Sequence, residues 1–389
     1  MTATFCKYSA VTACLLMSLV PMTQAKSKSK ASSTSYLVYV GTYTEHDSKG
    51  IYVYRFHAGR LTPIGPAAET FNPSFLAVGP SHRFLYAVNE TDTFQKQKTG
   101  AVSAFAIDRK SGRLTLLNQV PSGGAGPCFL SLDRTGKYVL VANYSSGSVA
   151  VFPLQASGRL GKASAFVQHT GHSVNLERQE APHAHDIAVS PDNRYALAAD
   201  LGTDKLLVYR FDPKAGSLAP NDPPGASVEP GSGPRHFAFD PSGRFVYLVN
   251  EIKSTVTTFS YNRAHGTLRE LQTVSALRRG FIGESTAAEI AVGRSGKFLY
   301  TSNRGEDSIA VFAIDPARHT LKSVEHVPTL GKEPRNFALD PTGAYLLAAN
   351  QNSDNIVVFS VNRRTGKLTP TGQVVEVPSP VCIVFVPEK

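Results

Sequence analysis

The chain has 389 residues, of which 42% are hydrophobic and 18% charged, with 31 glycines, 25 prolines and no tryptophan. This composition excludes a disordered or collagen-like chain and is ample for a buried core. The 40 basic and 30 acidic residues give a net charge of +10. No run of Lys or Arg after Lys30 is long enough for a nucleic-acid-binding arm, so we expect no nucleic-acid partner and favour small anionic ligands.

The first 25 residues have the pattern of a secretory signal peptide. Lys7 is their only charge, an apolar stretch runs from Tyr8 to Val20, and Ala25 ends a segment of small residues suited to signal peptidase. The apolar stretch is shorter than the roughly 20 residues of a bilayer-spanning helix. We therefore expect a signal peptide over residues 1–25, a periplasmic or secreted protein, and no membrane span. Lipidation at Cys14 is disfavoured because the apolar region follows that cysteine.

Residues 26–35, with the sequence KSKSKASSTS, predict a flexible basic leader, and order is expected from Tyr36 onward. After removal of the signal peptide only Cys128 and Cys382 remain, which is too few for a disulfide scaffold. Residues 36–389 are therefore expected to fold as one domain around an apolar core.

The sequence from Tyr36 onward repeats itself with a period of about 50 residues. Each copy holds short runs of alternating apolar residues, rich in Val, Phe, Tyr and Leu, between D-P-x-G-like and Asn-rich turns, and no copy has helical periodicity. The copies are NPSFLAVGPSHRFLYAVNE from Asn72, GPCFLSLDRTGKYVLVANYSSGSVAVF from Gly126, HAHDIAVSPDNRYALAADLGTDKLLVY from His183, GPRHFAFDPSGRFVYLVNEIKSTVTTF from Gly233, AAEIAVGRSGKFLYTSNRGEDSIAVF from Ala287, and EPRNFALDPTGAYLLAANQNSDNIVVF from Glu333.

Four strands per repeat predict an all-β fold, a seven-bladed β-propeller. A fourth run follows a G-x-L signature in most copies, for example at Gly112 and Gly158. The C-terminal run from Val381 matches only the first strand of a repeat, whereas Tyr36 to Leu61 supplies the other three. One blade shared between the two ends of the domain would close the ring and leave no open sheet edge.

The starts of the first strands and the ends of the second strands meet at one pole of a propeller, so their side chains converge on the mouth of the central channel. Ionisable groups at a half-buried mouth lose hydration unless they pair or bind a ligand, and we predict the functional site there. The ionisable side chains at these positions are Glu90, His183, His185, Arg235, His236, Glu251, Glu289, Arg304 and Arg335.

Several of these positions also have a purely structural interpretation. The Asn or Asp that ends every second strand, for example Asn250, is expected to hold the following turn by hydrogen bonds to the backbone. Glu251 and Arg304 follow this residue and are candidates for function or for an ion pair between blades. The i, i+2 spacing of His183 and His185 makes a metal site conceivable, but no third ligand is evident, and we predict neither metal nor cofactor.

Cys128 lies at a channel-lining position but is expected to be a small buried hydrophobe, because nothing in the same blade would lower the pKa of its thiol.

A resemblance to the lactonase family of seven-bladed propellers, typified by the propeller form of 6-phosphogluconolactonase, is carried by PHAHDIAVSPDNRYALAADLGTDKLLVY, GPRHFAFDPSGRFVYLVNE, AAEIAVGRSGKFLYTSNRG and EPRNFALDPTGAYLLAANQNSDN, with YVGTYT at Tyr39 and SPVCIVF at Ser379. It covers about residues 36–386. The fungal propellers that cycloisomerise carboxymuconates are similar in fold, and a His, two Arg and a Glu are proposed to act there. Carried over by motif, these fall on His185 or His183, Arg235 in P-R-H, Glu251 in V-N-E and Arg304 in S-N-R.

The resemblance implies a carboxylic ester hydrolase that opens a small sugar-type lactone. His185, Glu251, Arg235 and Arg304 would be catalytic, with arginines binding the anion and Glu or His activating water. The remaining mouth residues, His183, His236, Glu289, Arg335 and Glu90, would bind the substrate. We expect a lactone as the only partner and favour a monomer.

Two departures separate this chain from its family. Relatives often carry a histidine where this chain has Ala291, and the family's phosphorylated lactone belongs to the cytoplasm, whereas this chain has an export signal. The substrate is therefore expected to be a different sugar lactone. Alternatives are a non-catalytic binding module of the cell envelope and a muconate-type cycloisomerase; a pure scaffold would not need charges of both signs at the mouth.

Overall fold

The computed structural model describes residues 1–7, 34–44 and 47–388. The predicted signal peptide and basic leader fall almost entirely outside these residues and stay predictions. Thr34–Lys389 forms one compact unit, separate from Met1–Ser33. In the described part of the chain, no helix combines the length and the apolarity needed to cross a bilayer.

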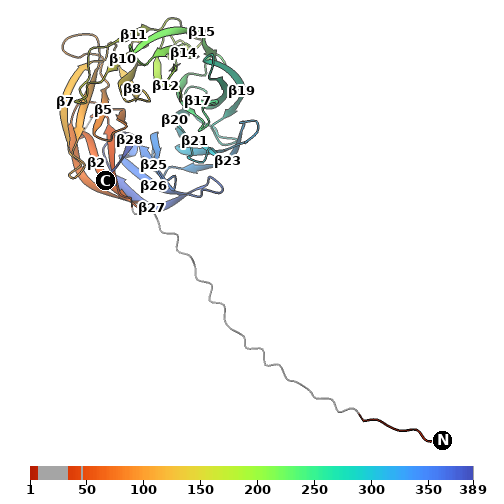
Figure 1. The fold of residues 1–389 in the computed structure, drawn as a ribbon. Coiled ribbons are helices and arrows are strands. Elements are labelled where there is room, and N and C mark those ends of the chain that lie inside the picture. Colours follow the sequence, from red (N-terminus) through yellow and green to blue (C-terminus); the bar gives the residue numbers. More distant parts are fainter. Residues whose placement is uncertain (8–33, 45–46, 389) are drawn as a thin grey trace. The chain divides into compact units, whose positions relative to one another are not determined.

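The compact unit consists of seven four-stranded antiparallel sheets arranged as blades around a ring (Figure 1). Blade 1 contains β1 (Tyr36–Thr42), β2 (Gly50–His57), β3 (Arg60–Glu69) and β28 (Pro380–Pro387); blade 2 contains β4 (Leu76–Val78), β5 (Phe84–Asn89), β6 (Ala101–Ile107) and β7 (Leu114–Pro121); blade 3 contains β8 (Pro127–Leu132), β9 (Tyr138–Asn143), β10 (Ser148–Pro153) and β11 (Ala165–Gln168). The remaining blades are blade 4, with β12 (Ala184–Val189), β13 (Tyr195–Asp200), β14 (Lys205–Asp212) and β15 (Ser217–Ser227); blade 5, with β16 (Pro234–Phe239), β17 (Phe245–Asn250), β18 (Thr255–Asn262) and β19 (Thr267–Ser275); blade 6, with β20 (Thr286–Val292), β21 (Phe298–Arg304), β22 (Ser308–Ile314) and β23 (Leu321–Pro328); and blade 7, with β24 (Pro334–Leu339), β25 (Tyr345–Asn350), a 3-10 turn η1 (Gln351–Ser353), β26 (Asn355–Val361) and β27 (Leu368–Glu376).

Blade 1 closes the ring as predicted. Its strand order is β28-β1-β2-β3, so the C-terminal strand pairs with the N-terminal one. The two strands run antiparallel in register from Tyr36 opposite Pro387 to Gly41 opposite Cys382. This pairing leaves no open junction between the first and the last blade, which confirms the seven-bladed propeller and its shared blade.

Aromatic side chains at one repeated position pack between neighbouring blades. The fifth residue of the third strand is a buried Phe or Tyr in every blade, and the apolar clusters combine residues of neighbouring blades. These residues are Tyr54, Phe105, Phe152, Tyr209, Phe259, Phe312 and Phe359. Truncation of a buried Phe typically costs about 3–5 kcal/mol, so this position supports the ring and keeps the channel geometry constant.

The repeated Asn and Asp residues follow the prediction only in part. Asp200 bonds the backbone of the turn after the second strand, where it accepts the Thr203 N–H, whereas the Asn residues bond side chains of the third strand. The Asn that ends the second strand bonds the side chain five residues later, at the start of the third strand, in four blades: Asn143 to Ser148, Asn250 to Thr255, Asn303 to Ser308 and Asn350 to Asn355. In the turn between strands one and two, the Asp133 carboxylate accepts the backbone N–H groups of Thr135 and Tyr138. Asp240 and Asp340 repeat this arrangement. The turns thus fix where each strand begins.

Candidate active site

A β-bulge at the start of the first strand aims one side chain of most blades into the channel mouth. In six of the seven first strands the register shifts at this point, so that one residue or two adjacent residues have no partner on the second strand. The bulged residues are Cys128, His185, Arg235, Ala288 with Glu289, Arg335 and Val381. A bulge bends its strand and redirects a side chain, and here six of these seven residues, all except Ala288, line one space together with Tyr43 and Glu90.

Glu251 is the centre of the charged cluster. Its Oε2 accepts hydrogen bonds from Arg235 Nε at 3.0 Å and lies 3.2 Å from Arg304 Nη2. Its Oε1 accepts a hydrogen bond from Arg178 Nη2 at 2.7 Å, and His185 Nε2 is 3.9 Å from Oε2. The ion pair between blades 5 and 6 that the sequence left open therefore exists, and three guanidinium groups share one carboxylate.

The members of this cluster differ in protonation state at neutral pH. Burial opposes the ionisation of Glu251, but the charges of Arg304 and Arg235 outweigh it and hold the pKa of this carboxyl well below its usual range. Burial, together with Arg235 and His236, holds the pKa of His185 well below its ordinary value. Burial and the neighbouring arginines lower the pKa of Arg235 to about 10. At neutral pH the cluster thus contains an anionic Glu251, cationic arginines and a neutral imidazole.

A second group of side chains lines the same space as His185 and Arg235. His236 Nδ1 is 3.1 Å from Glu289 Oε1, and the amide of Asn336 donates to Glu289 Oε2 at 2.6 Å. Burial lowers the pKa of His236, although Glu289 acts in the opposite direction. The edges of Phe75 and Phe129 contact the His236 ring. His236 and Glu289 therefore form a pair, and this pair adjoins the Glu251 cluster, because Arg235 Nη1 lies 3.3 Å from His236 Nε2 and the His185 and His236 rings are in contact.

Arg335 and Glu90 belong to a third group, which Tyr43 connects. Arg335 Nη2 donates to Tyr43 Oη at 2.8 Å, and Tyr43 Oη donates to Glu90 Oε2 at 3.0 Å. Ser74 donates a hydrogen bond to the same oxygen. The Arg335 guanidinium also lies 5.3 Å from the centre of the Tyr43 ring. Tyr43 was missed in the sequence, although it occupies the position in blade 1 that Glu90 occupies in blade 2.

His183 lies at the rim and does not join the Glu251 cluster. Its ring stacks on Tyr144 with 4.5 Å between centroids, and its nitrogens contact the Tyr144 carbonyl oxygen and the Glu180 carboxylate. His185 contacts the same tyrosine ring edge-on. No group of three or more His, Cys, Asp or Glu side chains suited to a metal ion occurs in the part of the chain that the structure describes.

Cys128 is buried, with its Sγ 3.6 Å from His185 Nδ1. Burial raises the pKa of its thiol well above the usual value, so the group stays a thiol at neutral pH and is a poor nucleophile.

No pattern in the sequence indicated that Arg178 contacts Glu251. It lies in the long connection between β11 and β12, which has no counterpart in the other repeats, and it reaches Glu251 in blade 5. Its side chain is 40% exposed, whereas that of Glu251 is 6% exposed. Arg178 is therefore the member of the cluster that an incoming ligand meets first.

The free space between the side chains of the channel throat is small. The space enclosed by Tyr43, His185, Arg235, Glu289 and their neighbours has a volume of about 10 Å³, which is roughly the room that one water molecule needs. A substrate must therefore approach from the outer surface of the mouth, where Arg178, Glu251 and Arg304 meet it.

Comparisons with known proteins agree on one family. A family model described as a lactonase with a seven-bladed β-propeller matches residues 37–385. The 6-phosphogluconolactonase of Bacillus subtilis is 40% identical over 354 residues, covering 90% of this chain and 99% of its own, and that of Formosa agariphila is 35% identical over 312 residues, covering 79% and 87%. The structure of the periplasmic gluconolactonase of Pseudomonas aeruginosa superposes with a TM-score of 0.85 at 39% identity, covering 91% of this chain and 99% of that one.

Proposed function

Because this chain belongs to the lactonase family of seven-bladed β-propellers, we propose that it is an exported hydrolase of unphosphorylated sugar lactones with its active site at the channel mouth. Its similarity to curated 6-phosphogluconolactonases makes it a lactone-opening carboxylic ester hydrolase. The observation that carries the proposed site is the cluster in which Arg178, Arg235 and Arg304 surround Glu251 beside a neutral His185.

His185 is the proposed general base. It is neutral at working pH, so it can take a proton from a water molecule whose oxygen attacks the lactone carbonyl carbon. The carbonyl π electrons move to the oxygen, which becomes an oxyanion. When that intermediate collapses, the bond to the ring oxygen breaks, and His185 returns its proton to the leaving oxygen. The product is an open-chain hydroxy acid, formed from one lactone and one water.

Arg304 is the proposed donor to the developing oxyanion. Its Nε is buried and has no hydrogen-bond partner among the described residues, and the nearest carboxylate oxygen, on Glu333, is 4.0 Å away. A buried donor without a partner is costly, and a substrate oxygen would satisfy it. Arg235 bonds Glu251 through Nε and the Ala288 carbonyl oxygen through Nη1 and supplies positive potential. One such donor typically contributes about 10²- to 10³-fold in rate.

Glu251 is too stable as an anion to be a strong base. Its role in this proposal is to hold the three guanidinium groups in place and to stabilise the imidazolium that forms on His185 during turnover. Its two oxygens serve opposite sides of the cluster, with Arg178 on one and Arg235 with Arg304 on the other. The pairs of His236 with Glu289 and of Arg335 with Glu90, which line the same space as His185 and Arg235, are assigned to substrate binding, and His183 to the rim.

In this proposal the substrate carries no phosphate because the protein is exported. The signal-like pattern over residues 1–25 supports export, and the Pseudomonas protein, at 39% identity, is described as a periplasmic gluconolactonase. Phosphorylated sugars are made inside the cell, so an exported enzyme would meet lactones produced by oxidation of free sugars.

The proposal is tested in a pH-stat with the protein from Lys26 onward, before and after chelator treatment. Gluconolactone and 6-phosphogluconolactone are compared, because each opened lactone releases one proton at neutral pH. We expect acid release above the spontaneous rate with gluconolactone, and a loss of about 10²- to 10⁴-fold in His185→Asn. Glu251→Gln should also lower the rate while the circular dichroism spectrum is retained.

Preference for 6-phosphogluconolactone would overturn the proposed substrate. Acceleration of neither lactone would leave a binding module or a cycloisomerase as the function. A chelator-sensitive rate would replace the metal-free mechanism.

A further inference from the structure

Blade 2 departs from the other blades at the same pole as the channel mouth. Eleven residues, 90–100, connect the terminal Asn89 of its second strand to β6, whereas four residues make this connection in each of blades 3 to 7. The loop folds back on itself, because Phe94 and Gln97 exchange backbone hydrogen bonds around Gln95 and Lys96, which both have positive φ. This tight turn holds Phe94 in place.

A second departure lies directly opposite this loop. Phe71 precedes the first strand of blade 2 and is 59% exposed. Its counterparts in blades 3 to 7 are the smaller or polar residues Ala125, Pro182, Ser232, Ser285 and Lys332. Leu116, which is 55% exposed, lines the same pocket as Phe71, and exposed apolar side chains that gather in one place are typical of a binding surface.

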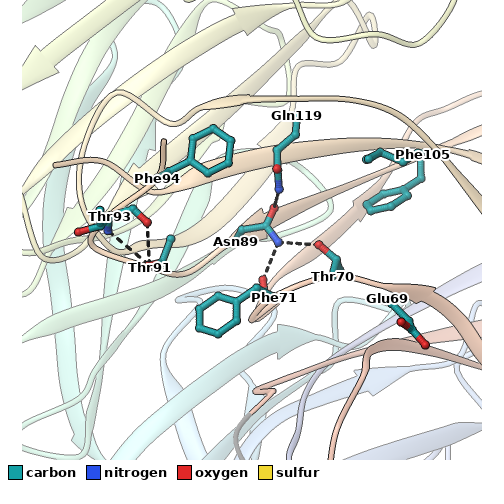
Figure 2. A pocket seen from close by; sticks show the side chains of 10 residues that line it. Glu69, Thr70, Phe71, Asn89, Thr91, Thr93, Phe94, Phe105 and Gln119 are labelled. Carbon is teal, nitrogen blue, oxygen red and sulfur yellow. Dashed lines mark hydrogen bonds between the residues drawn. The ribbon is translucent and has the colours of Figure 1, made fainter. Parts of the chain in front are cut away.

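The two departures enclose a pocket of about 490 Å³ between β3 of blade 1 and blade 2 (Figure 2). This volume lies in the range of small-molecule sites, roughly 300–1,000 Å³. Its lining combines aromatic or aliphatic side chains with amides and hydroxyls: Glu69, Thr70, Phe71, Asn89, Thr91, Thr93, Phe94, Phe105, Leu116 and Gln119.

The polar groups of this blade 2 pocket are held in fixed positions. Asn89 Nδ2 donates to Thr70 Oγ1 at 2.8 Å and to the Phe71 carbonyl oxygen, and Asn89 Oδ1 accepts from Gln119 Nε2 at 2.9 Å. Gln119 Nε2 also donates to Ser103. The amide nitrogen of Gln119 is thus committed to the protein, which leaves its carbonyl oxygen as an oriented acceptor at the pocket (Figure 2).

The charge of the blade 2 pocket differs from that of the arginine-rich channel mouth. Among the described residues that line it, Glu69 is the single charged one, and none is Lys, Arg or His; the Lys49 ammonium lies 3.8 Å from the Glu69 carboxylate at the exposed edge. Such a lining disfavours carboxylates and phosphates. It suits a neutral ligand with one apolar face and an edge of hydroxyl groups, because the face can pack on Phe71 or Phe94 while the hydroxyls meet Gln119 and the threonines. A sugar ring has this chemistry.

We propose that the blade 2 pocket is a binding site for a neutral saccharide, distinct from the catalytic mouth. The two sites share one segment of chain: Asn89 and Thr91 line the pocket, whereas Glu90 between them lines the mouth. A bound saccharide would therefore lie beside the active site without entering the channel, and it would hold the protein close to the sugars whose oxidation products it opens.

The site is tested by saturation-transfer NMR and calorimetry with maltose, cellobiose and methyl β-glucopyranoside as probes. We expect binding of at least one of them, weakened at least fivefold by Phe71→Ala and by Phe94→Ala. Lys332→Ala, the equivalent position in blade 7, is the matched control and should leave binding unchanged. Hydrolysis of gluconolactone should stay within about twofold in all three variants.

Three results would overturn this proposal: no binding of any probe at millimolar concentration, binding that survives both phenylalanine substitutions, or occupation of the blade 2 pocket only by apolar peptides. Because the pocket variants are assayed by ligand binding and the mouth by acid release, failure of one site leaves the result for the other intact.

Discussion

The two sides of the channel are built from the same repeat, yet at one repeated position one side is aromatic and the other polar or ionisable. This position is Phe75 in blade 2 and Phe129 in blade 3, but Asp186, His236, Glu289 and Asn336 in blades 4 to 7. The centroids of the two phenylalanine rings are 4.3 Å apart, and both rings make T-shaped contacts with the His236 ring. The apolar side excludes water, and electrostatic interactions on the charged side are stronger as a result. The repeated blades thus form a polar site where blades 4 to 7 carry polar or ionisable residues at a position that is Phe in blades 2 and 3.

The strongest test of this difference between blades is to replace the equivalent arginines of blades 5 and 7. Arg235 and Arg335 occupy the same bulge in the same P-R-x-F-A phrase, but Arg235 bonds Glu251 and Arg335 bonds Tyr43. We expect Arg235→Met to lower kcat/KM about 10²- to 10³-fold, as for loss of a preorganised electrostatic group.

Arg335→Met, measured in the same pH-stat assay, should lower kcat/KM less than about tenfold and act mainly through KM. Equal losses in the two variants would contradict the assignment of the reaction to the Glu251 cluster. Thermal unfolding of both proteins separates an effect on activity from an effect on folding.

The pH dependence of turnover tests the protonation states of the cluster. A base whose pKa is held well below its ordinary value stays unprotonated as the pH falls through 6.5, so kcat/KM should be flat from pH 8 to below 6.5 and decline only in more acidic solution. Burial is the main cause of this shift and Arg235 the next. Removal of Arg235 relieves part of it, so the acid limb of Arg235→Met should move to higher pH. An acid limb already centred near 6.5 in the native protein would show that His185 is not the base.

Arg178 lies on the exposed side of the same cluster, so a smaller effect is expected from its removal. In Arg178→Ala, Glu251 keeps two guanidinium partners, and solvent screens what is lost. We expect KM to rise about fivefold, which corresponds to about 1 kcal/mol, while kcat changes little. Initial-rate kinetics over a range of gluconolactone concentrations measure this split. A fall in kcat with constant KM would make Arg178 part of the reaction instead of the approach.

Cys128 marks the boundary between the two sides, and its removal should have the smallest effect. Its thiol is buried and protonated, although its sulfur lies near His185. Cys128→Ala should retain activity within about threefold and resist any inactivation by iodoacetamide. Loss of activity comparable to that of His185→Asn would restore the thiol as a nucleophile.

Much of the fold was predictable because equivalent residues recur in each repeat, and part of the site was predictable because its residues differ from those at equivalent positions in the other repeats. Turn residues such as Asp240 recur in register, so the hydrogen bonds of this carboxylate to the backbone followed from its position. Asn250 also recurs in register, but it bonds the Thr255 side chain, which the repeat alone did not indicate. Glu251 and Arg304 stood out because they replace generic residues, and they do form an ion pair. Most of the predicted mouth residues line one space, whereas His183 contacts Tyr144 and Glu180 at the rim.

The sequence by itself determined the number of blades, the closure of the ring and the pole at which the ionisable groups gather, since these follow from period, register and strand length. Only the tertiary structure decided which of these groups touch. The bulges that turn His185 and Arg235 into the channel depend on pairing with the second strand. Arg178 reaches Glu251 from a loop without a counterpart, across 73 residues of chain. Contacts of this kind depend on packing in three dimensions, which no local periodicity records.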